Sequence, residues 1–280
     1  MPTPTPTSCL KPPISLITLS PATPARPGDA ARIAEIHMAA FGPNAMLRAQ
    51  FPNETQTTSG GGEGGGGLRE SVRLKALADI RDPRVSVLVV RCYPNPGIEG
   101  DCWGEEEEEE DEGLVVAFAK WSLPANENDG YREAEWIWPP GTNMDVLNAW
   151  SSVTEEAERR LMRDCDGGFY RLTFMGTDPA FERRGAATKL VQWGLDRCRR
   201  DGVPAYLEGT LNAAAFYEKK MGFKPLERIS LRWPNRRGLS GDGATAIAND
   251  DGGNNEGDGD GDGEWVYEEI VFRYDPPKIN

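Results

Sequence analysis

The sequence predicts an α+β fold (an α/β sandwich) in which a mixed sheet is flanked by helices. Strand-like and helix-like hydrophobic patterns follow one another in mixed order, and the strands outnumber the helices. A chain of 280 residues is long enough to bury one substantial core. Patterned segments also resume after each low-complexity tract, which is typical of loop insertions rather than of linkers. We therefore expect a single domain over residues 1–280.

Five segments have the apolar spacing or the end signals of helices. The first opens at Pro27 and ends near Gly42, and the last is closed by Gly222 as its C′ residue. The predicted helices are residues 27–43, Leu68–Ile80, Asp145–Met162, Arg184–Arg200 and Asn212–Met221.

Seven segments with strand-like patterns, several of them rich in β-branched and aromatic residues, are predicted as strands. The second and third of them follow each other across an acidic insert and therefore predict a β-hairpin. The predicted strands are Ile14–Leu19, Arg84–Arg91, Leu114–Trp121, Phe169–Thr177, Pro204–Glu208, Ile229–Trp233 and Trp265–Tyr274.

Three low-complexity tracts interrupt these elements, at residues 59–67, 104–113 and 238–264. Glycine loses much entropy on ordering and like charges repel, so we expect disordered inserts at all three. Residues 105–112 and 241–264 hold sixteen acidic side chains and no Lys or Arg, so without them the formal charge of −14 becomes +2. The functional alternative is that the acidic inserts bind a partner.

Composition excludes several classes of function. No apolar run approaches the roughly 20 residues that span a bilayer, so an integral membrane protein is excluded. The N-terminus lacks the layout of a secretory signal, and we expect a cytoplasmic or nuclear protein. The five cysteines form no CxxC and His37 is the single histidine, so no metal site is predicted. The charge balance gives no support for nucleic-acid binding.

The most informative stretch is Phe174–Phe223, which predicts a strand, a polar loop, a long helix, a strand and a short helix. Gly185 at the loop-to-helix junction lets backbone approach a ligand, and the amides of residues 182–187 would be unpaired donors at a helix N-terminus. Arg183 and Arg184 add positive charge. This helix start suits a diphosphate, and the alternative is an ordinary entry into a helix.

The same stretch resembles motif A of the GNAT superfamily of N-acetyltransferases. The loop of residues 182–187 (ERRGAA) is similar to the family's [Gln/Arg]-x-x-Gly-x-[Gly/Ala] and follows Thr177-Asp178-Pro179. About 30 residues later, residues 216–223 (FYEKKMGF) are similar to the family's YEKLGF signature with one extra Lys. The two motifs occur in the expected order with a helix and a strand between them. The resemblance covers about residues 14–275 and is nearest to fungal GNAT proteins.

This resemblance implies a mostly antiparallel, splayed sheet in which acetyl-CoA inserts like an extra strand between Phe169–Thr177 and Pro204–Glu208. It implies main-chain contacts to the pantetheine arm and thioester from Met175, Gly176 and Thr177. It implies amide contacts to the diphosphate from Arg183, Arg184, Gly185, Ala186 and Ala187.

Tyr217 matches the family's tyrosine that protonates the departing CoA thiolate, and the alternative is that it belongs to the core with Phe216. The family's Asn seven residues before this tyrosine is Thr210 here, and Asn212 lies two residues later. Both are candidate cofactor contacts, and Thr210 is also a candidate cap of the final helix. Glu182 stands where the family has Gln or Arg, so its carboxylate would weaken CoA binding modestly or turn to solvent.

The remaining candidates have a structural alternative each. Glu208, at a strand end near the cleft, is the candidate catalytic base, and the alternative is a solvated strand end. Asp178 is expected to start the turn before Pro179, and His37 to be a satisfied, partly buried histidine. Three tryptophans either wall an acceptor pocket or cover a sheet edge: Trp121, Trp136 and Trp138. Two cysteines are expected to pack on helices: Cys165 and Cys198.

The resemblance therefore implies an N-acetyltransferase that transfers acetyl from acetyl-CoA to a primary amine by direct attack. The amine belongs to a small molecule or a peptide, because acceptor loops vary within such folds. We expect no nucleic acid and no membrane among its partners, and the sequence leaves the oligomeric state open. The alternative is a non-catalytic binding module with the same fold that acts through its acidic inserts.

Overall fold

The computed structural model describes residues 17–53, 67–95, 113–124, 133–165, 167–234 and 264–277. The predicted inserts lie outside the described residues, apart from Gly67, Gly113 and Glu264 at their ends. The first three residues of the predicted strand Ile14–Leu19 also lie outside them.

One eight-stranded sheet organises the described residues. Its strands are β1 (Ile17–Leu19), β2 (Thr23–Pro24), β3 (Val85–Pro94), β4 (Leu114–Ser122), β5 (Tyr170–Thr177), β6 (Ala205–Thr210), β7 (Lys224–Pro234) and β8 (Glu264–Tyr274). Their order is β1-β3-β4-β5-β6-β8-β7, and β2 pairs with β3 beside this order. Within the described part, the pairings are antiparallel except that β5 runs parallel to β6.

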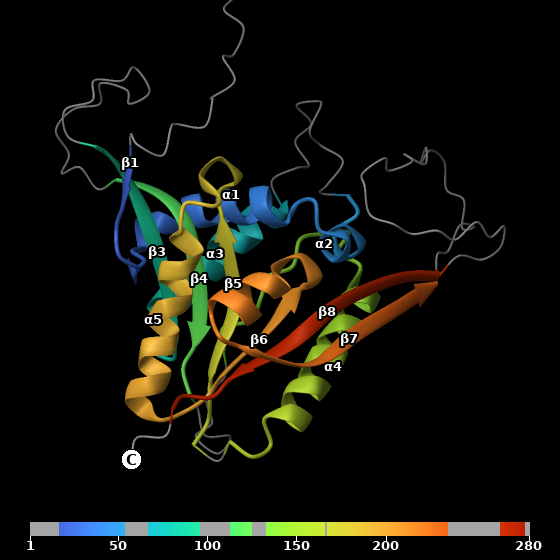
Figure 1. Cartoon of the computed structure of the whole chain (residues 1–280). Coiled ribbons are helices and arrows are strands. Elements are labelled where there is room, and N and C mark those ends of the chain that lie inside the picture. Colours follow the sequence, from blue (N-terminus) through green and yellow to red (C-terminus); the bar gives the residue numbers. More distant parts are fainter. Residues whose placement is uncertain are drawn as a thin grey trace, which may run out of the picture.

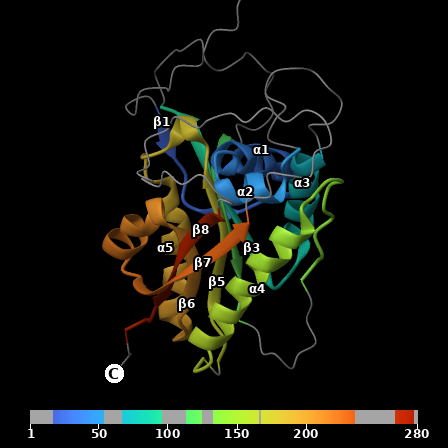
Figure 2. The same cartoon turned by 90° about the vertical axis from the view of Figure 1, so that its right-hand side faces the viewer.

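Helices cover both faces of this sheet, as Figures 1 and 2 show from two sides. They are α1 (Ala30–Phe41), α2 (Ala45–Gln50), α3 (Gly67–Arg81), α4 (Met144–Leu161) and α5 (Ala186–Asp201). On one face, α5 packs over β3 to β6 through Leu190, Val191 and Leu195. On the other face, α1 and α3 cover β3 and β4, and α4 covers the end formed by β6, β7 and β8. The fold class predicted from the sequence is confirmed.

Short helical turns complete the fold: η2 (Pro27–Asp29), η3 (Pro179–Phe181), η4 (Leu211–Ala213) and η5 (Phe216–Lys220). The last two replace the regular helix predicted over Asn212–Met221, because the chain forms a 3₁₀ turn and then a π-helical turn there. Among the described residues, no helix combines the length and the apolar character that crossing a membrane requires.

The structure differs from the sequence prediction at the starts of two elements, and it contains a helix that was not predicted. The helix predicted from Arg184 begins at Ala186, because Arg183 and Gly185 have positive φ angles that a right-handed helix cannot contain. Strand β7 begins at Lys224 rather than Ile229, because pairing with β8 extends it past a bulge at Pro225. Helix α2 was not predicted; the side chain of Asn44 caps it by accepting from the amides of Met46 and Leu47.

Trp121 belongs to the core on the α5 face and not to an acceptor pocket. Its side chain is fully buried, and the indole N–H donates to the carbonyl of Leu190 at 3.3 Å. A Cβ on Gly194 of α5 would lie 2.3 Å from the indole ring, so the helix approaches the sheet this closely only with glycine at that position. Of the three tryptophans considered, this one is therefore structural.

Candidate active site

Strands β5 and β6 lie side by side at one end and separate at the other. They pair at only two residues of β5, Tyr170 and Arg171. Farther along, β5 stays paired with β4 up to Thr177, and β6 stays paired with β8 up to Thr210. The sheet is therefore split between β5 and β6, and each strand has one edge facing the split.

A β-bulge lies where the separation begins. The pairing of β4 with β5 shifts between Lys120 and Trp121, which leaves Thr173 as an extra residue on β5. Ser122 lies against the bulge, with its Oγ 3.3 Å from Thr173 Oγ1. A bulge bends its own strand and increases the local twist, so it turns β5 away from β6 at this point.

A cleft of about 630 Å³ opens into the split. Met175 of β5 and Thr210 of β6 line it from the two separated strands, and α1, α2 and α4 line it from their face of the sheet. This volume lies within the range of about 300–1,000 Å³ that is typical of small-molecule sites. The cleft thus joins the α1–α4 face to the opening between the strands.

The loop before α5 leaves the amino end of that helix uncovered. Gly185 occupies the N-cap position with φ of 95°, and no side chain caps the first turn. A Cβ at Gly185 would meet no described atom within 4 Å. Arg184 braces the loop, since its guanidinium lies over the Phe181 ring and donates to the carbonyl of Ala180. Uncapped amides at the positive end of a helix dipole favour an anion, and Glu182 is exposed, so its carboxylate can point into solvent.

Tyr217 is buried on η5 and lines the cleft. Its ring packs among Phe216, Phe223 and Phe272, with centroid distances between 5.2 and 5.9 Å. A Cβ on Gly209 of β6 would lie 3.0 Å from this ring, so the ring lies against the backbone of β6. Burial, and then the charge of Glu269, raise the pKa of Tyr217 above its ordinary value, so the hydroxyl keeps its proton.

Glu269 and Tyr267 of β8 also line the cleft, and the sequence analysis missed both. The hydroxyl of Tyr267 donates to Glu269 Oε1 at 2.7 Å. Burial raises the pKa of Glu269 to about 7, with the Tyr267 hydrogen bond lowering it and the charge of Glu208 raising it. The signal in the sequence is the strand alternation WVYEEIVFRY, which places a carboxylate on the face of Tyr267 and Val271.

Residues 98–223 match the acetyltransferase (GNAT) family. This segment is therefore similar to a GNAT acetyltransferase domain. A search of curated proteins finds no match to the chain. The segment contains the split between β5 and β6, the loop before α5 and Tyr217, whereas Glu269 lies beyond its end.

Several solved structures are similar to this chain, and the two with TM-scores of 0.50 and 0.51 support the fold alone. The C-terminal condensation domain of Ebony, in complex with beta-alanyl-dopamine, is 14% identical with a TM-score of 0.51, over 93% of this chain and 100% of that one. A polyamine N-acetyltransferase of Drosophila melanogaster is 13% identical with a TM-score of 0.50, over 92% and 99% of the two chains. A Corynebacterium glutamicum structure described as histone acetyltransferase HPA2 and related acetyltransferase is 16% identical with a TM-score of 0.48, over 93% and 97%.

The residues that the resemblance assigned to the pantetheine arm lie at the end of β5. Met175, Gly176 and Thr177 pair with β4, so the other edge of their backbone faces the split. Met175 lines the cleft, whereas Gly176 and Thr177 do not. A Cβ on Gly176 would lie 2.8 Å from the Phe118 ring, so packing requires this glycine in any case.

Among the remaining assigned residues, Glu208 and Thr210 line the cleft and Asn212 does not. Glu208 pairs with Arg171 at 3.0 Å, so it is not the solvated strand end of the alternative interpretation. Thr210 occupies the N-cap position of η4 without a side-chain hydrogen bond to its amides, so the suggested cap is wrong. Asn212 is exposed on η4. Asp178 starts a turn as predicted, by accepting from the amide of Ala180 at 2.8 Å.

His37 of α1 is buried more fully than the sequence suggested. Burial lowers its pKa to about 4, so the ring is neutral at physiological pH. The imidazole packs against Phe41 and Phe174, with centroid distances of 4.7 and 5.6 Å. It therefore forms part of the apolar lining of the cleft. Cys198 is buried on α5 as expected, and Cys165 is half-buried just after α4.

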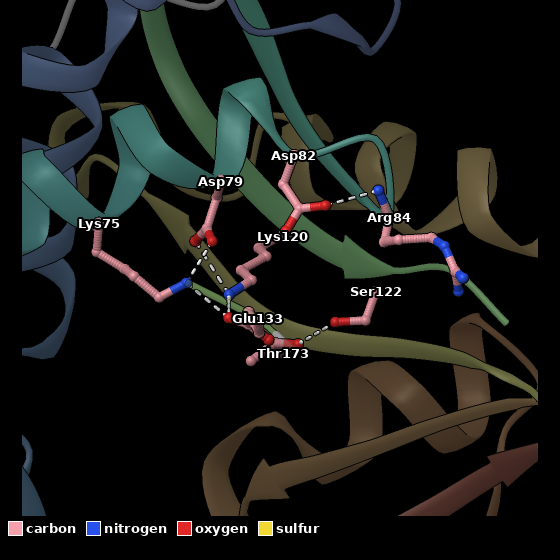
Figure 3. A network of polar contacts seen from close by, with 8 residues as sticks. All are labelled: Lys75, Asp79, Asp82, Arg84, Lys120, Ser122, Glu133 and Thr173. Atoms are coloured by element: carbon pink, nitrogen blue, oxygen red, sulfur yellow. Dashed lines mark hydrogen bonds and ion pairs between the residues drawn. The ribbon is translucent and has the colours of Figure 1, made fainter. Parts of the chain in front are cut away.

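A network of four charged side chains supports one wall of the cleft (Figure 3). Lys75 bonds to Asp79 and Glu133, and Lys120 bonds to the same two carboxylates. Except for Glu133, these side chains are almost fully buried, with exposures of 2% to 5%. Burial raises the pKa of Glu133, but the two lysines outweigh it and hold the pKa below the ordinary value.

This network fixes the segment that carries Trp136 and Trp138. Glu133 anchors its beginning to α3 and β4, and the hydroxyl of Ser71 on α3 donates to the carbonyl of Ile137. The two indoles stack with a centroid distance of 4.7 Å, and both line the cleft. Trp136 and Trp138 therefore form part of a pocket wall, which is one of the two alternatives left open by the sequence.

Proposed function

We propose that this protein is an N-acetyltransferase that transfers acetyl from acetyl-CoA to a primary amine. The observation that carries the proposal is the split between β5 and β6, which leads into a cleft of about 630 Å³. A continuous sheet would leave no edge for an extended ligand, whereas two separated strands offer main-chain groups to one. The match of residues 98–223 to the acetyltransferase family supports the same activity.

The chain's own residues suit acetyl-CoA, which supplies the acetyl thioester when it is bound. The free backbone edge at Met175, Gly176 and Thr177 would hold the pantetheine arm. The amides of the five residues at the open helix start would hold the diphosphate: Arg183, Arg184, Gly185, Ala186 and Ala187. Thr210 is the candidate contact near the thioester, because it lines the cleft, while Asn212 would have to contact the cofactor outside it.

Tyr217 would act as the general acid that returns a proton to the thiolate. Its raised pKa keeps the hydroxyl protonated, and the same burial would make a thiolate in this cleft more basic than in water. The ring that carries this hydroxyl packs against Phe216, Phe223 and Phe272, and these contacts restrain its position before the substrate arrives. The described residues would form one domain, with the inserts as loops within it.

Calorimetry with acetyl-CoA tests the proposal, and α5 offers a matched pair of variants. Gly185 and Gly202 lie at its two ends, with φ of 95° and 70°, and a Cβ would meet no described atom within 4 Å at either. Gly185→Val and Gly202→Val therefore impose similar backbone strain, but only the first covers the helix start. We expect the first to reduce acetyl-CoA affinity at least about tenfold, or 1.4 kcal/mol, and the second to leave it unchanged.

Further results would test the transferase, the residues assigned to it and the alternative of a binding module. No binding of millimolar acetyl-CoA to the wild-type protein would refute the transferase. Equal affinity of the two glycine variants would refute the assignment of the loop. Tyr217→Phe should keep acetyl-CoA affinity and lower turnover, and acetyl-CoA binding without amide formation by the wild type would favour a binding module.

A further inference from the structure

The basic side chains that line the cleft have carboxylate partners, but not every carboxylate there has a basic partner. Lys120 is paired with Glu133 and Asp79, and Arg171 is paired with Glu208 and Glu158. The basic side chains that line the cleft are thus already neutralised by carboxylates. Glu135, which also lines it, is exposed to solvent.

Glu269 differs from Glu208, the other half-buried carboxylate among the described residues that line the cleft. Among the described residues, no Lys, Arg or His forms an ion pair with it, and its carboxylate accepts only from the Tyr267 hydroxyl. An isolated carboxylate with little access to water is costly unless it gains a positive partner or a proton. The cleft therefore contains one carboxylate whose charge is left for a ligand to neutralise.

The position of Glu269 brings it to the split between the strands. In the sheet it pairs with Thr210, the residue after Gly209, and the Tyr217 ring lies against Gly209. The charge of Glu269 raises the pKa of Tyr217, so the two groups interact electrostatically. A base and an acid thus lie near the same stretch of β6.

We propose that Glu269 binds the protonated amine of the acceptor and takes one of its protons as the general base. This inference rests on the proposed function and identifies the part of the cleft that receives the amine. Glu208 is the less suitable base, because Arg171 already occupies its carboxylate. The charge of Glu208 instead disfavours ionisation of Glu269, which makes Glu269 the more ready to accept a proton.

The titratable groups that face Glu269 are consistent with a base at neutral pH. They are Tyr267 on its own strand, Glu208 on β6 and Tyr217 on η5, and Asn44 of α2 reaches it indirectly by donating to the Tyr267 hydroxyl at 2.9 Å. With a pKa of about 7, Glu269 is partly ionised at physiological pH, which is the condition under which a general base is most effective. Below that pH it becomes protonated and can no longer accept.

The proton and bond changes balance as follows. The amine nitrogen forms a bond to the acetyl carbon while the carbon–sulfur bond breaks. One ammonium proton passes to Glu269 and later to solvent. The second proton lost by the nitrogen replaces the one that Tyr217 gives to the sulfur, so the products are the amide and the thiol.

The apolar lining of the cleft indicates the rest of the acceptor. Trp150 of α4 lies edge-on to Tyr267 with a centroid distance of 5.1 Å, and Leu147 of α4 lines the cleft with them. Trp136 and Trp138 form the wall described above. Since these surfaces are apolar and the cations are already paired, they favour a primary amine on an aromatic or hydrocarbon frame.

Binding and kinetics with 2-phenylethylamine test this inference. With CoA present, wild-type protein should bind 2-phenylethylamine at least about tenfold more tightly than the uncharged 2-phenylethanol, and Glu269→Gln should bind the two equally. With acetyl-CoA, Glu269→Gln should lower kcat/KM at pH 7 by about 100-fold and remove the fall in rate below pH 7. The control is Glu268→Gln, whose side chain pairs with Arg228 at 3.2 Å; it should change neither quantity.

The outcomes separate this inference from the proposed function. Failure of the wild type to bind acetyl-CoA would reject the transferase itself. Binding of acetyl-CoA with no preference for the amine over the alcohol, or an unchanged preference and pH profile in Glu269→Gln, would overturn the role of Glu269 alone. If that variant does not fold, Tyr267→Phe removes the hydrogen bond that lowers the pKa of Glu269, and the fall in rate should move to higher pH. An unmoved profile would equally overturn the proposal.

Discussion

Two carboxylates that line the cleft have opposite environments. Glu133 pairs with two lysines that also share the buried Asp79. Glu269, in the part of the chain that the structure describes, accepts a hydrogen bond only from a tyrosine hydroxyl. The pKa of Glu133 is held below its ordinary value, and that of Glu269 is raised to about 7.

The two carboxylates differ in whether the folded protein provides a positive partner for their charge. Glu133 has gained its positive partners in folding, so it holds a wall in place and stays ionised. Glu269 has lost water without gaining a cation, so folding leaves it ready for a proton or an ammonium group. The first arrangement stabilises the fold at the cleft, and the second keeps a reactive group there at some cost in stability.

The largest expected effect is the loss of stability on breaking the network of Lys75, Asp79, Lys120 and Glu133. Asp79→Asn removes one of the two carboxylates that neutralise Lys75 and Lys120, and those ammonium groups are almost fully buried. We expect a loss of about 3 kcal/mol in the free energy of unfolding, measured in urea. The control is Glu70→Gln on the same helix, which removes an exposed pair with Arg73 and should leave the urea midpoint unchanged. Equal midpoints for the two variants would mean that the buried network contributes little.

At Glu269, by contrast, we expect the ionised carboxylate to lower the stability of the folded protein. Because the pKa of Glu269 rises from 4.5 to about 7 on folding, the folded state binds this proton more tightly than the unfolded chain. The resulting stability is fully present below pH 4.5 and is lost as the pH rises towards 7. Compared with Glu269→Gln, wild-type protein should therefore lose about 2 to 3 kcal/mol of unfolding free energy across this interval. A constant difference between the two proteins from pH 4.5 to 7 would contradict the raised pKa.

Much of the fold was predictable because its elements carry local patterns. The β3–β4 hairpin and α1, α3, α4 and α5 follow from strand-like and amphipathic segments. Helix α2 has only six residues and too little length for a periodic pattern, and its cap at Asn44 was not recognised. The start of β7 was hidden because Pro225 and Glu227 disfavour a strand, and it forms through pairing with β8.

The residues of the site likewise fall into those that the sequence predicted and those that it did not. Gly185 and Tyr217 lie in short motifs, so the sequence identified them without knowledge of the fold. Glu269 follows a long insert, and it reaches the cleft only because β8 lies between β6 and β7 in the sheet. No local sequence pattern predicts that β8 pairs with both β6 and β7. The partners of Lys120, namely Asp79 on α3 and Glu133, are likewise fixed by tertiary packing.

The smallest expected effect is a rise in the KM of the acceptor when Glu133 is changed. Glu133→Gln removes the charge that both lysines share but keeps an acceptor oxygen, so the Trp136–Trp138 wall should loosen without leaving its place. We expect KM for 2-phenylethylamine to rise about fivefold, equivalent to about 1 kcal/mol, with kcat unchanged. The fall in rate below pH 7 should also remain, since Glu269 is untouched. If Glu133→Gln lost this pH dependence, Glu133 and Glu269 would be coupled, and the role of the base could not be assigned to Glu269 alone.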